Sequence, residues 1–194
     1  MFFLVTLDDL VTVEPGDLGK SHVDRLIAAI QTRYVDRIIP DVGLVIAFYD
    51  FLRMGDAPIF PGNGSVHFNC RFRLVAFRPF KGEILTGRLV RSAPEGLTVS
   101  LGFFEDIRIP CTLLREPSEY DDVDKVWFWR YGEHSLYLDL LQNIRFKVEE
   151  VQFHKQDGGQ HPVALSTSRR LPPMTIIGSI NSDGLGLESW WQTE

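Results

Sequence analysis

Cysteine is scarce in this sequence of 194 residues, which contains only Cys70 and Cys111 and no CxxC pair. This scarcity excludes a disulfide framework and a thiolate zinc site, and it is typical of a reduced, intracellular compartment. No run approaches the roughly 18 apolar residues that span a bilayer, so we expect no membrane partner. The initial run MFFLV lacks a basic flank and soon meets Asp8 and Asp9, which indicates a strand and not a signal peptide.

Catalytic and metal-binding motifs are also lacking. The five histidines show no HExxH spacing, and neither a GxxxxGK[ST] loop nor a GxSxG elbow is present. The neighbours Glu149 and Glu150 would point to opposite faces of a strand. Residues 182–186 (SDGLG) have neither the acidic spacing of a calcium loop nor a helix after them, so we predict a tight turn. We therefore expect no cofactor, no metal and no enzyme activity, which leaves binding as the function.

The charge balance does not demand a nucleic-acid partner. The formal net charge is −6, with 44% hydrophobic and 24% charged residues, as in ordinary globular proteins. A negative total does not exclude a local basic face, because steering depends on how charge is distributed. The length suits one large domain or two small ones.

The first half reads as strand, helix, strand, strand. Residues 2–13 form a β-rich run with an irregular middle, and residues 43–52 (GLVIAFYDFL) are continuously apolar, which predicts a strand buried on both faces. Residues 67–77 alternate, so that one side carries apolar residues and the other His67, Asn69, Arg71 and Arg73. An α+β domain over residues 1–80 is predicted.

A helix is predicted over residues 21–38, where apolar residues recur at steps of three and four. Ser21 with Asp24 three residues later is a fair N-cap signal, and Pro40 ends the pattern. We expect the apolar stripe of this helix to serve the core first and an interface second.

The second half has the pattern of a small closed Greek-key barrel, the OB fold, over residues 81–194. Three short strands (83–92, 96–102 and 106–114) precede an acidic loop at 115–125 and a strand-like segment at 126–141. Two further strands follow at 144–153 and 174–180. The polar segment between them, 154–173, is Gly- and Pro-rich and is expected to be mobile.

The stretch FRPFKGE joins the two halves. Pro79 cannot donate a ladder hydrogen bond, so it ends the first sheet, and Gly82-Glu83 opens the barrel. Residues 78–81 are thus a short inter-domain joint, which we expect to hold two lobes rigidly.

Alternation in the barrel strands predicts which side chains face outward. Leu85, Leu89, Val99, Ile107 and Phe146 exemplify the inward set, and the candidate RNA-binding residues on the outward side are Arg88, Arg91, Arg108, Arg145 and Lys147. These cations suit a phosphate backbone, but outward strand positions are commonly polar, and the pattern leaves both interpretations open. The turn at residues 95–98 (EGLT) has no aromatic platform on which bases would stack.

Two pairs of tryptophans stand out. Trp127 and Trp129 share one face of a strand-like segment, and Trp190 and Trp191 lie near the end of the sequence. Docking of the terminal pair within the chain is favoured over docking on a partner.

Several motifs together resemble the larger stalk subunit shared by archaeal and eukaryotic nuclear RNA polymerases. They are NGS at 63–65, FN at 68–69 and RLVAFRPFKGE at 73–83. Within that family, other segments resemble the RNA polymerase III member: IIPDVGL (38–44), EGLTVSL (95–101), FEDIRIP (104–110), VWFW (126–129) and DGLGLESWW (183–191). The resemblance covers nearly the whole chain, although the 154–173 loop looks short for this member.

The resemblance implies a truncated ribonucleoprotein-like tip domain followed by an all-β OB-fold barrel. It implies a non-catalytic nuclear subunit that pairs with a smaller helical stalk subunit and docks on RNA polymerase III core subunits. Gly62, Asn63 and Gly64 match the family's core-contacting tip loop. The barrel would touch single-stranded nascent RNA weakly and without sequence preference, and would serve initiation factors.

Two alternatives remain open. One is the same role in another nuclear RNA polymerase, and the other is a free-standing OB-fold RNA-binding factor. The acidic loop at 116–124 either faces a basic partner or is solvated.

Overall fold

The computed structural model describes residues 1–13, 21–55, 58, 64–154 and 171–191. The chain divides into two compact units, Met1–Arg78 and Pro79–Glu194. Among the described residues, no helix is both long and apolar enough to cross a membrane.

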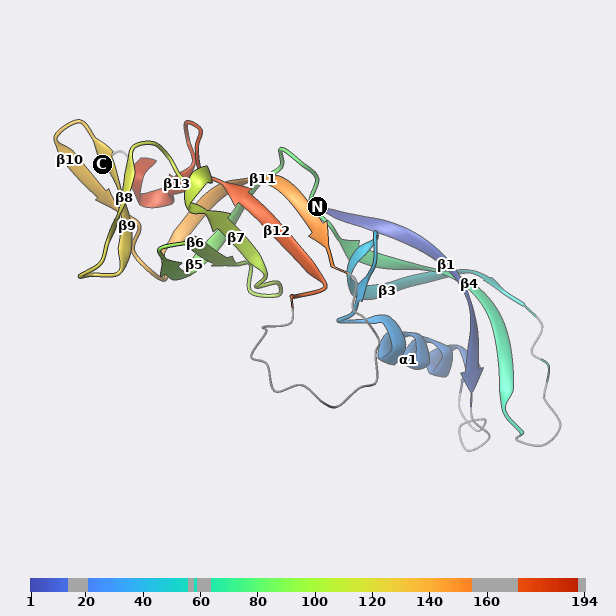
Figure 1. Ribbon diagram of the computed structural model, residues 1–194. Coiled ribbons are helices and arrows are strands. Elements are labelled where there is room, and N and C mark those ends of the chain that lie inside the picture. Colours follow the sequence, from blue (N-terminus) through green and yellow to red (C-terminus); the bar gives the residue numbers. More distant parts are fainter. Residues whose placement is uncertain (14–20, 56–57, 59–63, 155–170, 192–194) are drawn as a thin grey trace. The chain divides into compact units, whose positions relative to one another are not determined.

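The first unit is an antiparallel sheet with one helix on it (Figure 1). The sheet has the order β1-β4-β3-β2, formed by β1 (Phe2–Val13), β4 (Val66–Phe77), β3 (Gly43–Met54) and β2 (Ile38–Ile39), and the helix is α1 (His22–Tyr34). Twelve residue pairs join β1 to β4 without a register shift, so the irregular middle predicted for residues 2–13 is wrong. The α+β class is confirmed.

The core of this unit lies between α1 and one face of the sheet. Leu26 and Ile30 of α1 are fully buried against Phe72 and Cys70 of β4. The ring of Phe72 lies 5.8 Å from that of Tyr34, centroid to centroid, so the helix is fixed to the sheet through an aromatic contact.

The helix ends four residues earlier than predicted. Val35 is extended and Asp36 has φ 61°, after which Ile38 pairs with Leu44 in β2–β3. The apolar side chain of Ile38 therefore continues the helical spacing by coincidence, since its backbone hydrogen bonds belong to the sheet. Ser21 stands at the N-cap as predicted, but its side chain makes no capping hydrogen bond.

The prediction that the 43–52 strand is buried on both faces is also wrong. β3 is buried only at its start, Gly43–Val45, whereas Tyr49 and Leu52 are 55% and 50% exposed. In the described part of the unit, α1 covers a single face of the sheet, so the other face of β3 remains open.

The second unit is a five-stranded closed barrel, so the OB-like fold is confirmed. Its strands are β5 (Ile84–Ala93), β6 (Gly96–Ser100), β7 (Ile107–Pro110), β11 (Asn143–Phe153) and β12 (Met174–Ser179). Closure comes from β12, which pairs in parallel with β7 and antiparallel with β11. The inward residues named above are buried: Leu85 is 7% exposed, and Leu89, Val99, Ile107 and Phe146 are fully buried. Leu101, which the same alternation predicts to face inward, is only half-buried.

The acidic 115–125 segment is not wholly a loop, which corrects the prediction. Ser118–Asp121 forms β8, which pairs with β9 (Val126–Tyr131), and β9 pairs with β10 (His134–Tyr137). The sequence did not predict this strand because acidic residues are uncommon in strands. Its apolar contact comes from Tyr120, whose ring centroid lies 5.4 Å from that of Trp127.

The KGE turn at the start of the second unit is fastened to the barrel. Gly82 has φ 91°, and its N–H donates to the Val148 carbonyl at 2.7 Å, while the Val148 N–H donates to the Glu83 carbonyl at 2.8 Å. The positive φ explains why glycine follows Lys81.

Candidate nucleic-acid interface

The five predicted RNA-binding cations lie on the outside of the barrel. The side chains of Arg88, Arg91, Arg108 and Arg145 are exposed, and Lys147 is half-buried. Strand register divides them into two groups. The groups differ in whether neighbouring acceptors already bind the cations.

The first group consists of Arg88, Arg145 and Lys147, on the paired strands β5 and β11. Lys147 Nζ lies 3.0 Å from Glu149 Oε1, and Arg145 Nη2 lies 4.0 Å from Glu188 Oε1. Arg88 donates from Nε to the Leu141 carbonyl at 2.8 Å. Neighbouring acceptors therefore already engage these cations, which lowers their attraction for a further anion.

The second group is the pair Arg91 and Arg108, which flank Thr98. Thr98 of β6 is opposite Arg91 of β5 on one side and opposite Arg108 of β7 on the other. A bulge between Leu89 and Arg91 turns Arg91 to the same side as Thr98. Neither guanidinium forms an ion pair within the described residues.

Within this pair, Arg108 acts electrostatically on Asp106. Burial raises the pKa of Asp106, while the charge of Arg108 and that of Glu105 act on it in opposite directions. Arg91 and Arg108 nevertheless remain the more available cations, because no carboxylate in the described part of the chain reaches ion-pair distance from either.

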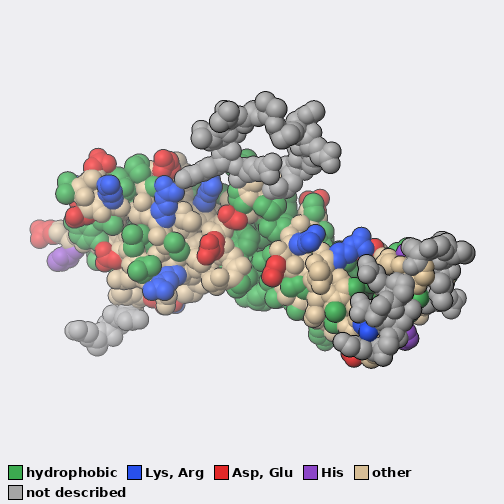
Figure 2. Space-filling model, turned by 90° about the horizontal axis from the view of Figure 1, so that it is seen from below, with side chains coloured by type: hydrophobic (Ala, Val, Ile, Leu, Met, Phe, Trp, Pro, Cys, Tyr) green, Lys and Arg blue, Asp and Glu red, His purple; other side chains and the backbone are tan. Residues whose placement is uncertain are grey.

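No aromatic platform accompanies the Arg91–Arg108 pair on strand β6. The outward residues there are Thr98 and Ser100, as the sequence predicted. Figure 2 shows Lys and Arg side chains scattered among acidic and apolar ones over one face of the barrel unit, not gathered in a single patch. Such a surface suits weak contact with an extended polyanion.

Sequence reasoning missed the acceptors that engage the first group. Glu149 follows Lys147 across a bulge in β11, and Glu188 lies in the short helix η3 (Glu188–Trp191), 43 residues from Arg145 in the sequence. The alternation of a regular strand does not reveal either partner.

The predicted tip loop lies largely outside the described residues. Gly62 and Asn63 are not described, whereas Gly64 is exposed with φ 67°. Among the described residues, no group of three or more potential ligands could hold a metal ion.

The expectation that the last tryptophans dock within the chain is confirmed. The rings of Trp190 and Trp129 lie 5.7 Å apart, and the guanidinium of Arg115 sits 4.3 Å from the Trp129 ring centroid. Trp191 donates from Nε1 to the Leu185 carbonyl at 3.1 Å. The turn predicted at 182–186 is present, with Gly184 at φ 80°.

Family models match both units. A model described as "SHS2 domain found in N terminus of Rpb7p/Rpc25p/MJ0397" matches residues 8–64, and one described as "RNA polymerase III subunit Rpc25" matches residues 83–191. An SHS2 domain followed by an OB-like barrel places the chain in the class of RNA polymerase stalk-type subunits.

Sequence similarity to curated proteins shows to which member of that class the chain is related. A Bos taurus protein named DNA-directed RNA polymerase III subunit RPC8 is 38% identical over 201 residues, 98% of each chain. The Schizosaccharomyces pombe protein of that name is 34% identical over 99% of this chain and 100% of its own. DNA-directed RNA polymerase II subunit RPB7 of Saccharomyces cerevisiae is 29% identical over 53% of this chain and 61% of its own. The chain belongs to the RNA polymerase III subunit Rpc25 family.

Proposed function

We propose that this chain works in the nucleus as a non-catalytic stalk subunit of RNA polymerase III. In this role it pairs with a smaller helical stalk subunit and docks on the polymerase core through its N-terminal unit, with Gly62, Asn63 and Gly64 in the contact. The observation that carries the proposal is similarity over the full length, across both units, to proteins named as RNA polymerase III subunits.

Exposed apolar side chains of the N-terminal unit support a partner there. Phe2, Phe3 and Leu4 at the start of β1 are 46%, 40% and 43% exposed, and Leu52 and Met54 at the end of β3 are 50% and 48% exposed. The two groups lie at different parts of the sheet, since Leu4 is opposite Val75 and Met54 is opposite Cys70, so each is a separate candidate contact with a partner.

Affinity purification tests the assignment. A tagged copy of the chain, expressed in its own cells, is expected to recover the largest polymerase III subunits from nuclear extract. Replacement of Gly62, Asn63 and Gly64 by alanine is expected to reduce this recovery, while Gly132→Ala, in a turn of the barrel unit, serves as the control. Recovery of another polymerase would reassign the member, and recovery of no polymerase would favour a free-standing RNA-binding factor.

The barrel is proposed to contact single-stranded nascent RNA, and initiation factors as well. Arg91 and Arg108 are the residues we assign to RNA first, because their charges are the less compensated. Arg88, Arg145 and Lys147 come second, since their present contacts must be exchanged for phosphate.

Salt dependence of RNA binding separates the two groups. For a uridine oligonucleotide, the double change Arg91→Ala and Arg108→Ala is expected to reduce the slope of log K against log salt by about 1.4, or about 0.7 per phosphate contact. The matched double change Arg145→Ala and Lys147→Ala is expected to reduce it by less. An equal reduction would show that the existing ion pairs do not weaken the first group, and unchanged slopes in both would remove all four residues from the interface.

A further inference from the structure

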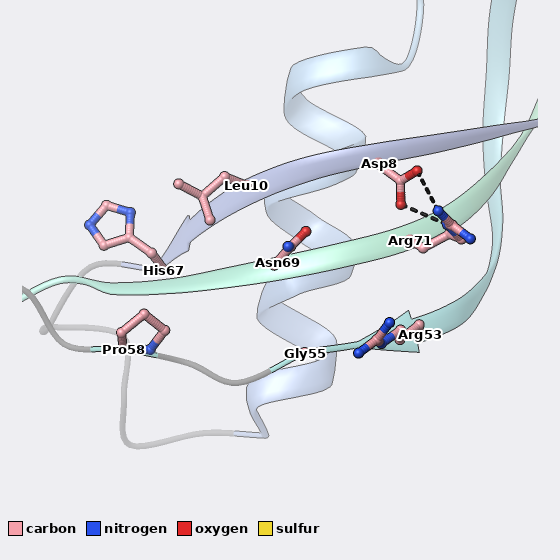
Figure 3. Close-up of a pocket in the computed structure, with 8 residues that line it drawn as sticks. All are labelled: Asp8, Leu10, Arg53, Gly55, Pro58, His67, Asn69 and Arg71. Carbon is pink, nitrogen blue, oxygen red and sulfur yellow. Dashed lines mark hydrogen bonds and ion pairs between the residues drawn. The ribbon is translucent and has the colours of Figure 1, made fainter.

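A pocket lies on the face of the N-terminal sheet that α1 leaves open. It has a volume of about 610 Å³, and residues of three neighbouring strands and the chain after them line it. Figure 3 shows the labelled side chains on the near side of the sheet, with α1 behind it. The polar members that matter here are Asp8 of β1, Arg53 of β3, and Asn69 and Arg71 of β4.

The register places one acid and two bases in a single row across the pocket. Asp8 is opposite Arg71, and Arg71 is opposite Arg53. Arg71 donates to both oxygens of Asp8, at 2.7 Å from Nε and 2.9 Å from Nη2 (Figure 3). With two bases and one acid, this row carries one uncompensated positive charge. Like charges directly opposite each other destabilise a sheet, so an added anion would stabilise the row.

The uncompensated charge belongs to Arg53. The hydrogen bond from Arg71 lowers the pKa of Asp8, and the nearby charge of Arg53 adds to that lowering. Arg71 already occupies both carboxylate oxygens, and within the described residues the Arg53 guanidinium makes no hydrogen bond or ion pair. Its donor fork is thus available to a carboxylate from outside the chain.

The next row of the sheet is closed to such a ligand. Arg73 lies between Thr6 and Asp50 and donates from Nε to Asp50 at 2.7 Å. The excess charge is therefore confined to one guanidinium, which suits a single anionic group. A polyanion that follows several cations in line would meet the carboxylates of Asp8 and Asp50 on this face.

The walls of the pocket indicate what accompanies the anionic group. Leu10 is 51% exposed at one side, and Pro58 lies exposed at another. The Asn69 carboxamide also lines the pocket (Figure 3) and offers both a donor and an acceptor to a peptide group. A residue with an apolar side chain beside an acidic one would match both the walls and the charge.

We propose that this pocket binds an acidic segment of a partner protein, with a Glu or Asp carboxylate on Arg53 and an adjacent apolar side chain on Leu10 and Pro58. The ligand chemistry of this pocket does not depend on which polymerase the chain serves.

Fluorescence anisotropy with the full chain tests the proposal. The probe is a labelled peptide EELEEL, with QQLQQL as the neutral counterpart. Arg53→Gln is expected to weaken binding of EELEEL about fivefold, because it removes the available fork. Arg37→Gln makes the same charge change at an exposed residue of the same unit, outside the pocket lining, and is expected to leave binding unchanged.

Asp8→Asn is expected to change the affinity in the opposite direction. It removes a repelling carboxylate and releases the second guanidinium, so binding of EELEEL should tighten by a few-fold and fall more steeply with salt. A role of Arg53 in folding alone would not give opposite signs for the two variants.

Two outcomes would overturn the proposal. In one, QQLQQL binds as well as EELEEL, or Arg53→Gln leaves the affinity for EELEEL unchanged. In the other, a uridine oligonucleotide displaces the peptide and loses affinity on Arg53→Gln, which would assign the pocket to nucleic acid. Either result leaves recovery of the polymerase unaffected, so failure here is distinguishable from failure of the proposed function.

Discussion

At the scale of single residues, several glycines are fixed by close backbone approach. Gly43 has φ 136°, and a Cβ there would stand 2.3 Å from the Phe77 carbonyl oxygen. Gly96 has φ 138°, and a Cβ would stand 2.1 Å from the Ile109 carbonyl oxygen. Because the obstructing atoms are backbone, a neighbouring side chain cannot give way to relieve the clash. Both glycines lie in segments that resemble the RNA polymerase III member of the family, namely IIPDVGL and EGLTVSL.

Gly96→Ala is expected to lower the free energy of unfolding of the barrel by about 2 to 4 kcal/mol, because it combines a strained φ with the backbone clash. Gly132→Ala, at φ 61° with nothing within 4 Å, is the matched control and should cost about 1 kcal/mol. Urea unfolding followed by tryptophan fluorescence measures both, since all four tryptophans lie in the second unit. Equal losses would contradict the clash.

Asp50 makes the N-terminal sheet sensitive to acid. Hydrogen bonding from Arg73 lowers the pKa of Asp50 below its usual 3.8. A carboxyl group with a depressed pKa stabilises the folded state above the unfolded value, and this contribution is lost as pH falls through the folded value. Hydrogen exchange of β4 amides should therefore accelerate, beyond the intrinsic change, as pH falls below the unfolded value of 3.8, and more in the wild type than in Asp50→Asn. The exposed Asp122→Asn is the control, and identical acid dependence in all three would exclude the contribution.

At the scale of elements, local spacing predicted the strands and misjudged two borders. The residues after Tyr34 keep a helical apolar pattern, yet pairing of Ile38 with Leu44 takes them into the sheet. Residues 118–121 are acidic and look like a loop, yet pairing with β9 makes them a strand. In both cases the hydrogen bonds of a short hairpin decided the structure, and the periodicity of a single sequence does not specify that pairing.

Arg115 contacts the short helix η3, with its guanidinium 5.9 Å from the Trp191 ring centroid, which offers an element-scale test. Arg115 lies over the Trp129 ring, donates to the Ser182 carbonyl at 3.0 Å and pairs with Asp183, with its side chain only 18% exposed. Arg115→Lys removes the planar fork and the stacking, so the barrel should lose about 1 to 2 kcal/mol in unfolding free energy.

Arg130→Lys is the matched control for this change. The Arg130–Glu119 pair is exposed, with side chains 56% and 51% accessible, and should contribute less than about 0.5 kcal/mol. Urea unfolding and the Trp emission maximum report both variants. A loss for Arg115→Lys no larger than that for Arg130→Lys would mean that η3 docks through the tryptophan contacts alone.

At the scale of the whole molecule, the chain has the exposed apolar surface of a protein that functions in a complex. We expect the chain expressed alone to aggregate and to become monodisperse when co-expressed with a smaller helical partner, as measured by light scattering. Replacing Phe2 and Phe3 by serine should improve the behaviour of the isolated chain and weaken co-purification of the partner. A well-behaved monomer that gains nothing from the partner would count against the stalk assignment.

The sequence by itself determined the α+β unit followed by the OB-like barrel, the inward barrel residues, the absence of a catalytic motif and the family. Each of these follows from local alternation, from breakers such as Pro79 and Gly82, or from contiguous motifs. Only the tertiary structure decided where α1 ends, that Ser118–Asp121 is a strand, that Glu149 and Glu188 compensate part of the outer cations, and that Arg71 binds both oxygens of Asp8 in the same row as Arg53. The physical reason is that charge compensation and strand pairing depend on the register between strands. Local periodicity does not specify that register, whether the partners are near in the sequence, as Ile38 and Leu44 are, or far apart, as Asp8 and Arg71 are.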